Sequence, residues 1–152
     1  MSSFRALWTN TKAMPQLLRM FCQGAMVAPP ILVLLLVLPI TEWTVNGRQV
    51  QYAELWSSGA GLSMLVFMAT ATAGAWGLAA RANWSRWLWV ATPLAPVLVA
   101  AVYPSTWFTQ EVAGDASVWV GSAATSVIIF ACLFLIPAVK NYAAGSAATD
   151  AT

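Results

Sequence analysis

Histidine is absent from this 152-residue chain, and charged residues are scarce. Without histidine, the chain cannot build a histidine-ligated haem, a typical zinc site or a histidine general base. Charged residues make up 8% of the chain and hydrophobic residues 60%, whereas about a quarter of the residues in a soluble domain are charged. The composition therefore excludes an ordinary soluble fold. It offers no Gly-rich phosphate motif and no basic domain, so nucleic acid is not an expected partner.

Four long apolar stretches divide the chain, and none of the seven basic or five acidic side chains lies inside them. They cover residues 20–41, 55–80, 87–103 and 117–139. Most approach the roughly 20 residues that a helix needs to cross about 30 Å of hydrocarbon. The sequence therefore predicts an all-α membrane protein with four transmembrane helices. Proton or ion transport usually leaves an ionisable side chain within the spans, and these spans contain none.

The basic residues predict the orientation, because cytoplasmic flanks of membrane helices retain Lys and Arg. Six of the seven lie on one side of the predicted spans: Arg5, Lys12, Arg19, Arg81, Arg86 and Lys140. Only Arg48 falls on the other side, with four acids: Glu42, Glu54, Glu111 and Asp115. We therefore expect both termini to be cytoplasmic in a bacterial-type inner membrane. Both cysteines would then project into the cytoplasmic half of the bilayer, where structural disulfides are rarely maintained.

Nine tryptophans support the same spans, since the indole ring favours the headgroup level on both sides of a bilayer. Those expected at the outer edge are Trp43, Trp56, Trp107 and Trp119, and those towards the inner edge are Trp8, Trp76, Trp84, Trp87 and Trp89. Anchoring is the interpretation that we adopt for these rings. A stacking platform for a carbohydrate, lipid or quinone is the alternative.

The two ends of the chain differ in character. Residues 1–19 predict a cytoplasmic amphipathic segment that lies along the membrane surface before Pro15 opens the next helix. The apolar run that follows is too long for a secretory signal, and no convincing cleavage site follows it. Residues 141–152 are rich in Ala, Ser, Gly and Thr, a composition typical of a disordered tail.

The two halves of the chain share a spacing that indicates an internal duplication. Arg19 precedes Pro29 by ten residues and Arg86 precedes Pro96 by ten; a second proline, then tryptophan, follows in each half. The predicted units are 20–80 and 81–140, two tandem helical hairpins. This layout loosely resembles the SPW-repeat membrane proteins of bacteria, which place proline and tryptophan at the end of one helix of a two-helix unit. Here the pair is split, as Pro39 with Trp43 and Pro104 with Trp107.

Polar residues within the spans have two interpretations. Gln23 is the most polar side chain in a span, and we expect it to satisfy a carbonyl that Pro29 or Pro30 frees. Alternatively, proline-bent helices beside a small-residue seam would form a pathway for a neutral or lipophilic substrate, in a homodimer for example. Its candidate polar lining is Gln23, Thr70, Thr72 and Thr92.

The absence of charged chemistry in the spans favours a protein that is not an enzyme and has no cofactor or metal. We predict a small polytopic membrane protein that binds a membrane or periplasmic protein, as an accessory subunit or an immunity protein would. The outer acids would contact a basic surface, pair with Arg48 or remain solvated. Candidate partner-binding residues are Trp43, Glu54, Gly61, Trp107, Glu111, Asp115 and Ser122. Besides transport, lipid or quinone binding between the hairpins is a further alternative.

Overall fold

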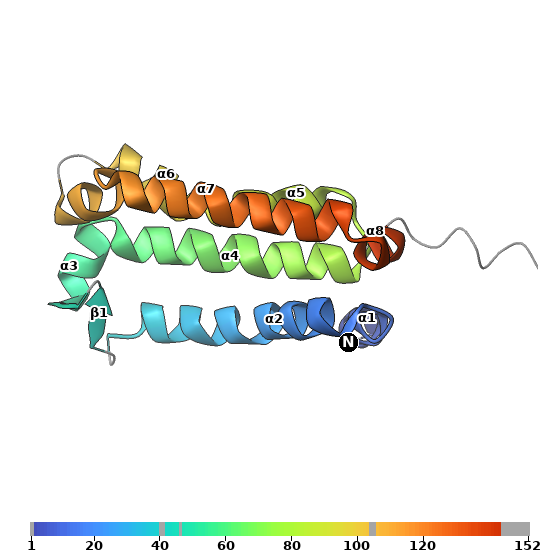
Figure 1. Ribbon diagram of the computed structural model, residues 1–152. Helices are drawn as coiled ribbons and strands as arrows, with labels where there is room; N and C mark the ends of the chain where they lie inside the picture. Colours follow the sequence, from blue (N-terminus) through green and yellow to red (C-terminus); the bar gives the residue numbers. More distant parts are fainter. Residues whose placement is uncertain (1, 40–41, 46, 104–105, 144–152) are drawn as a thin grey trace, which may run out of the picture.

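Long helices lying side by side dominate the architecture, and a short β hairpin lies at one end of them (Figure 1). The computed structural model describes residues 2–39, 42–45, 47–103 and 106–143. In chain order its elements are α1 (Ser2–Thr11), α2 (Gln16–Val37), β1 (Trp43–Val45), β2 (Arg48–Val50), α3 (Tyr52–Ser57), α4 (Ala60–Ala79), α5 (Trp84–Ala91), α6 (Ala95–Val102), the π-helical turn η1 (Thr109–Ala113), α7 (Ala116–Phe130), the π-helical turn η2 (Ala131–Leu135) and α8 (Pro137–Ala143).

Three of the described helices are long and apolar enough to cross a membrane: Gln16–Val37, Ala60–Ala79 and Ala116–Leu135. A fourth span is present if α5 and α6, which meet at a bend of 58°, together count as one. The all-α class and the multi-pass membrane character are thus confirmed, with three spans or up to four. Lipid contact follows from the spans, because their apolar side chains need an apolar surrounding.

The first span lies four residues earlier than predicted. α2 begins at Gln16, directly after Pro15, and ends at Val37 instead of Thr41. Proline suits the start of a helix because the first backbone N–H groups have no partner there. Pro29 and Pro30 lie inside α2, and the helix continues through them.

The second apolar stretch forms two helices instead of one. α3 ends at Ser57 and α4 begins at Ala60, with Gly59 between them at φ +87°. That left-handed conformation favours glycine. A Cβ at Gly59 would also lie 2.7 Å from the ring of Tyr103, so the break has both a conformational and a packing cause.

The third stretch bends between α5 and α6, as its prolines predict. Pro93 has no N–H to donate, so the helical ladder is interrupted there. Two hydroxyl groups donate to backbone carbonyls around the bend. Thr92 Oγ1 donates to Leu88 O at 2.8 Å, and Ser63 Oγ on α4 donates to Pro96 O at 3.1 Å.

α4 is the central helix, and small residues explain why. About 44% of its most apolar window is buried, against 17% for α2 and 11% for the window in α7 and η2. α4 packs against α2, α5 and α6. Gly74 and Gly77 leave room for Trp89 and Trp84 of α5, whose rings lie within 3 Å of where a Cβ would be. Small residues permit such close helix approach in membranes, while α2 and α7 present apolar faces outward.

The terminal segments close the opposite end of the bundle from the hairpin (Figure 1). Asn10 on α1 donates from Nδ2 to Ala79 O at 3.2 Å, which ties α1 to α4. Tyr142 on α8 is buried, and the Arg81 guanidinium lies 5.2 Å from its ring centroid. The predicted disordered tail was therefore placed too early, since 141–143 are helical; residues 144–152 lie outside the described part.

The tandem duplication stays a prediction. The first unit contains a continuous α2, a β hairpin and α3, whereas the second begins with the bent pair α5–α6 and continues into η1. Pro104, one of the spacing markers, lies outside the described residues.

Candidate functional site at the hairpin end

The hairpin end carries five of the seven candidate partner-binding residues, namely Trp43, Glu54, Trp107, Glu111 and Asp115. We call this region the cap and define it as residues 42–45, 47–57 and 106–115. Its β1 and β2 strands pair antiparallel, with Trp43 opposite Val50 and Val45 opposite Arg48. The hairpin was missed from the sequence, although Asn46-Gly47 between two β-favouring runs is a strong hairpin signal. Gly47 has φ +80°, as such turns require.

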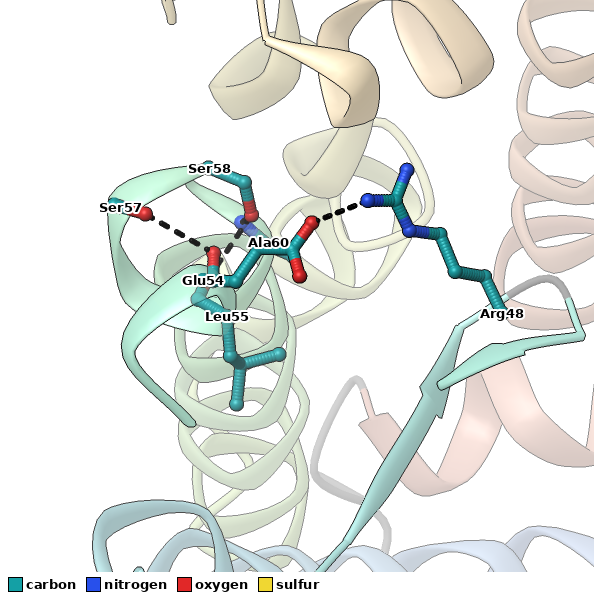
Figure 2. A network of polar contacts seen from close by, with 6 residues as sticks. All are labelled: Arg48, Glu54, Leu55, Ser57, Ser58 and Ala60. Atoms are coloured by element: carbon teal, nitrogen blue, oxygen red, sulfur yellow. Dashed lines mark hydrogen bonds and ion pairs between the residues drawn. The ribbon is translucent and has the colours of Figure 1, made fainter. Parts of the chain in front are cut away.

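Arg48 connects three segments of the cap. Its Nη2 lies 2.6 Å from Glu54 Oε1 on α3, which makes an ion pair (Figure 2). Its guanidinium carbon also lies 5.0 Å from the ring centroid of Trp107. The structure therefore brings Glu54 and Trp107 together through Arg48. Of the three interpretations of the outer acids, Glu54 follows the one in which the acid pairs with Arg48.

Threonine hydroxyls fix the 106–113 segment onto the helices below it. Thr106 Oγ1 donates to Ser58 O at 3.0 Å. Thr109 Oγ1 lies 2.8 Å from Tyr103 O and 3.1 Å from Ala100 O. The Thr106 bond joins this segment to the end of α3, which is distant in sequence, and the Thr109 bonds join it to the end of α6, which lies just before it. Neither threonine was predicted as a functional residue, because nothing in their spacing indicates such a role.

The remaining outer acids lie on the cap surface. Glu111 is exposed on η1. Asp115 caps α7, where its Oδ1 accepts a hydrogen bond from the backbone N–H of Ser117 at 2.8 Å. Hydrogen bonding from Ser117, first from its side chain and then from its backbone N–H, holds the pKa of Asp115 below its usual value, because it favours the charged carboxylate. Asp115 thus has a structural role in addition to its exposure.

Trp43 lies in a cleft between the end of α2 and the hairpin. The cleft has a volume of about 560 Å³. Its lining residues are Pro39, Glu42, Trp43, Gln49, Val50, Gln51 and Tyr52. Tyr52 Oη donates to Val37 O at 2.7 Å, so the tyrosine joins α3 to the last turn of α2. The cleft therefore has fixed walls, and among these lining residues only Glu42 is charged.

Apolar contacts support the cap from beneath. Leu36, Leu55 and Phe108 are buried there, and the rings of Trp43, Trp56 and Trp107 pack against them. The Nε1 atoms of these three rings are buried and have no hydrogen-bond partner within the described part of the chain. The three rings therefore stabilise the cap through apolar packing.

The two small-residue candidates on the helices differ in accessibility. Gly61 is buried, and a Cβ there would lie 3.0 Å from the Trp56 ring. Gly61 is therefore a packing residue within the chain, and a role for it in partner binding stays a prediction. Ser122 on α7 is half-buried and adjoins Gly121, which is exposed and has open space around its Cα.

The candidate polar lining of the spans does not form one group. Gln23 Nε2 donates to Thr11 Oγ1 at 2.9 Å, so it secures α1 instead of a proline-freed carbonyl. Thr70 donates within α4 to Val66 O at 2.9 Å, and the buried Thr92 donates within its own helix. Thr72 lines a second, largely apolar groove between α2 and α4, with Pro30 and Trp76.

No protein-family model, curated protein or solved structure matches the chain. The likeness to SPW-repeat proteins therefore rests on the sequence pattern alone. Within the described residues, no cluster of three or more His, Cys, Asp or Glu side chains could hold a metal ion.

Proposed function

We propose that this multi-pass membrane protein acts without catalysis, by binding a membrane or periplasmic protein through its cap. The observation that carries the proposal is the Arg48 bridge, which joins the hairpin, α3 and the 106–115 segment. A surface fixed before binding loses less conformational entropy when a partner docks. An accessory subunit or an immunity-type protein would use such a surface, with both termini cytoplasmic and the cap on the outer side.

The charges of the cap indicate what kind of partner surface it would bind. The cap contains the acids Glu42, Glu54, Glu111 and Asp115 and the single base Arg48. Because Arg48 is already paired with Glu54, the exposed carboxylate of Glu111 and that of Asp115 are available to a partner. Complementary charge mainly speeds encounter and selects partners, so the proposed partner presents a basic face.

The test is recovery of the complex from its native membrane. The full-length protein would be solubilised in mild detergent, and the mass of the complex and every co-purifying chain would be determined. A different protein in stoichiometric amount is the expected result. A clean monomer or homo-oligomer would contradict the proposal.

Two matched variants locate the contact. Glu111→Lys reverses an exposed charge that has no bonding role in the described cap, so the fold should be unaffected while partner recovery falls. Gly121→Leu places a large side chain on the open face of α7 and serves as the comparison. If only Gly121→Leu reduced the recovery of the partner, the contact would be assigned to the α7 face instead of the cap.

Transport of a neutral or lipophilic substrate is the second candidate, and the 58° bend between α5 and α6 favours it. Discontinuous helices line the substrate sites of several transporter folds. Against transport, the hydroxyl groups of Thr70 and Thr92 donate hydrogen bonds to carbonyls of their own helices instead of facing a pathway together. Substrate flux into liposomes containing only this protein would support transport over partner binding.

A further inference from the structure

The cleft beside the hairpin has a chemistry that the partner-binding proposal does not use. Its charge is negative: Glu42 is exposed, and no ion pair in the described part of the chain involves it. The α2 helix ends at Val37, two residues before the lining residue Pro39, and the Val37 carbonyl accepts a hydrogen bond from Tyr52 Oη. The C-terminal end of a helix carries about half a negative charge. Both features attract a cation.

The cleft walls suit an organic cation better than a metal ion. Trp43 and Tyr52 contribute aromatic rings to the lining. The Nε1 of Trp43 is buried without a partner in the described residues, so the surface that Trp43 offers to the cleft is ring carbon. Aromatic rings attract quaternary and primary ammonium groups through their negative faces. The single carboxylate of Glu42 neutralises a monovalent ammonium, whereas it would leave half the charge of Ca²⁺ or Mg²⁺ without a counter-charge in the described lining.

The position of the cleft indicates which organic cations can reach it. It opens where α2 leaves its apolar segment, the level at which a span meets the lipid headgroups. Gln49 and Gln51 add neutral amides to the lining, and no basic residue is among the described lining residues. The described lining therefore offers a phosphate no cationic partner, and the ammonium is the group that its charge favours.

We propose that this cleft binds an organic ammonium group, which Glu42 neutralises and the rings of Trp43 and Tyr52 contact. A lipid headgroup such as ethanolamine or choline carries this group, and so does a free amine. The site is independent of the protein partner proposed above, and its ligand needs no other chain.

The experiment uses choline as the probe and full-length protein delipidated in a non-ionic detergent. Binding would be measured by isothermal titration calorimetry, with 3,3-dimethyl-1-butanol as the uncharged ligand of the same shape. Saturable binding of choline, without binding of the alcohol, is expected. Equal binding of both ligands, or no saturable choline binding, would overturn the proposal.

Two carboxylate variants make the test specific. A unit charge at about 4 Å contributes about 1 kcal/mol in water, so Glu42→Gln should weaken choline binding about fivefold. Glu111→Gln removes an exposed carboxylate of the cap outside the cleft lining and should leave the affinity unchanged. Equal weakening by both variants would show a general surface-charge effect and reject the site.

Nanodiscs distinguish the two sources. In discs of phosphatidylglycerol, which has no ammonium group, choline should bind as in detergent. If the headgroup is the natural ligand, discs of phosphatidylcholine or phosphatidylethanolamine should lower the apparent affinity for choline by competition. Equal affinity in all discs would assign the site to a free amine, and failure in all of them would refute it.

Discussion

Replacing Gly77 by alanine tests the packing between α4 and α5. A Cβ at Gly77 would lie 2.5 Å from Ser85 Cβ and 2.9 Å from the ring of Trp84. Ser85 is fully buried, and its Cβ moves only with the backbone, so the helices must shift apart. Added volume in a packed interior typically costs about 1–3 kcal/mol.

The matched control is Gly121→Ala on α7, where an added Cβ meets nothing within 4 Å. Both changes gain roughly 0.5–1 kcal/mol of helix propensity, so that gain cancels when the two variants are compared. The free energy of unfolding of Gly77→Ala should therefore be lower than that of Gly121→Ala by about 1–3 kcal/mol. The difference corresponds to about a 5-fold to more than 100-fold change in the unfolding equilibrium constant.

The assay is SDS-induced unfolding in mixed micelles, followed by far-UV circular dichroism. Circular dichroism is preferred to fluorescence because the change is made beside a tryptophan. If Gly77→Ala were as stable as Gly121→Ala, or more stable, the close contact of α4 with α5 would be refuted.

Three further predictions use the same unfolding assay or simple labelling. Gly59→Ala should destabilise the protein by about 1–3 kcal/mol, because alanine is strained at positive φ and its Cβ would meet the Tyr103 ring; unchanged stability would contradict the break before α4. The pKa of Asp115 is lowered in the folded state, so its contribution is present above the unfolded pKa and is lost as pH falls through the folded one. In Asp115→Asn, the free energy of unfolding should therefore fall less steeply as the pH is lowered. A slope equal to that of the unmodified protein would argue against the hydrogen bond between Asp115 and Ser117. An apolar maleimide should label Cys132, which is exposed, before Cys22, which is fully buried; mass spectrometry would reveal the order, and equal labelling would count against the packing of α2.

The spans were predictable because apolar length and missing charge act over about 20 residues at once. The first boundary still shifted, since Arg19 was taken as the limit of the span, yet it lies inside α2. Long basic side chains can extend toward the interface from within a helix, so a charge bounds a span only loosely. The bend at Pro93 was predictable for a local reason, the missing N–H.

The parts that escaped prediction depend on contacts between distant segments. The break at Gly59 becomes intelligible only with the Tyr103 ring beside it. The burial of Gly61 likewise follows from Trp56 folding over it, which no spacing rule reveals. In the cap, Glu54 and Trp107 are predictable as candidates from residue type, but the contact of both with Arg48 depends on how the hairpin folds against α3 and the 106–115 segment.

The central position of α4 has a consequence for the order in which this protein is built. During synthesis α2 emerges directly after α1, and its main packing surface, α4, emerges only after the hairpin and α3. α7 in turn packs on α5, which is made after α4. The packing surface at the centre of the bundle is therefore complete only midway through translation. Two co-expressed fragments divided at the turn after α4 would have to recover each other mainly through that helix, with the cap contacts of Arg48 with Trp107 and of Thr106 with Ser58 added.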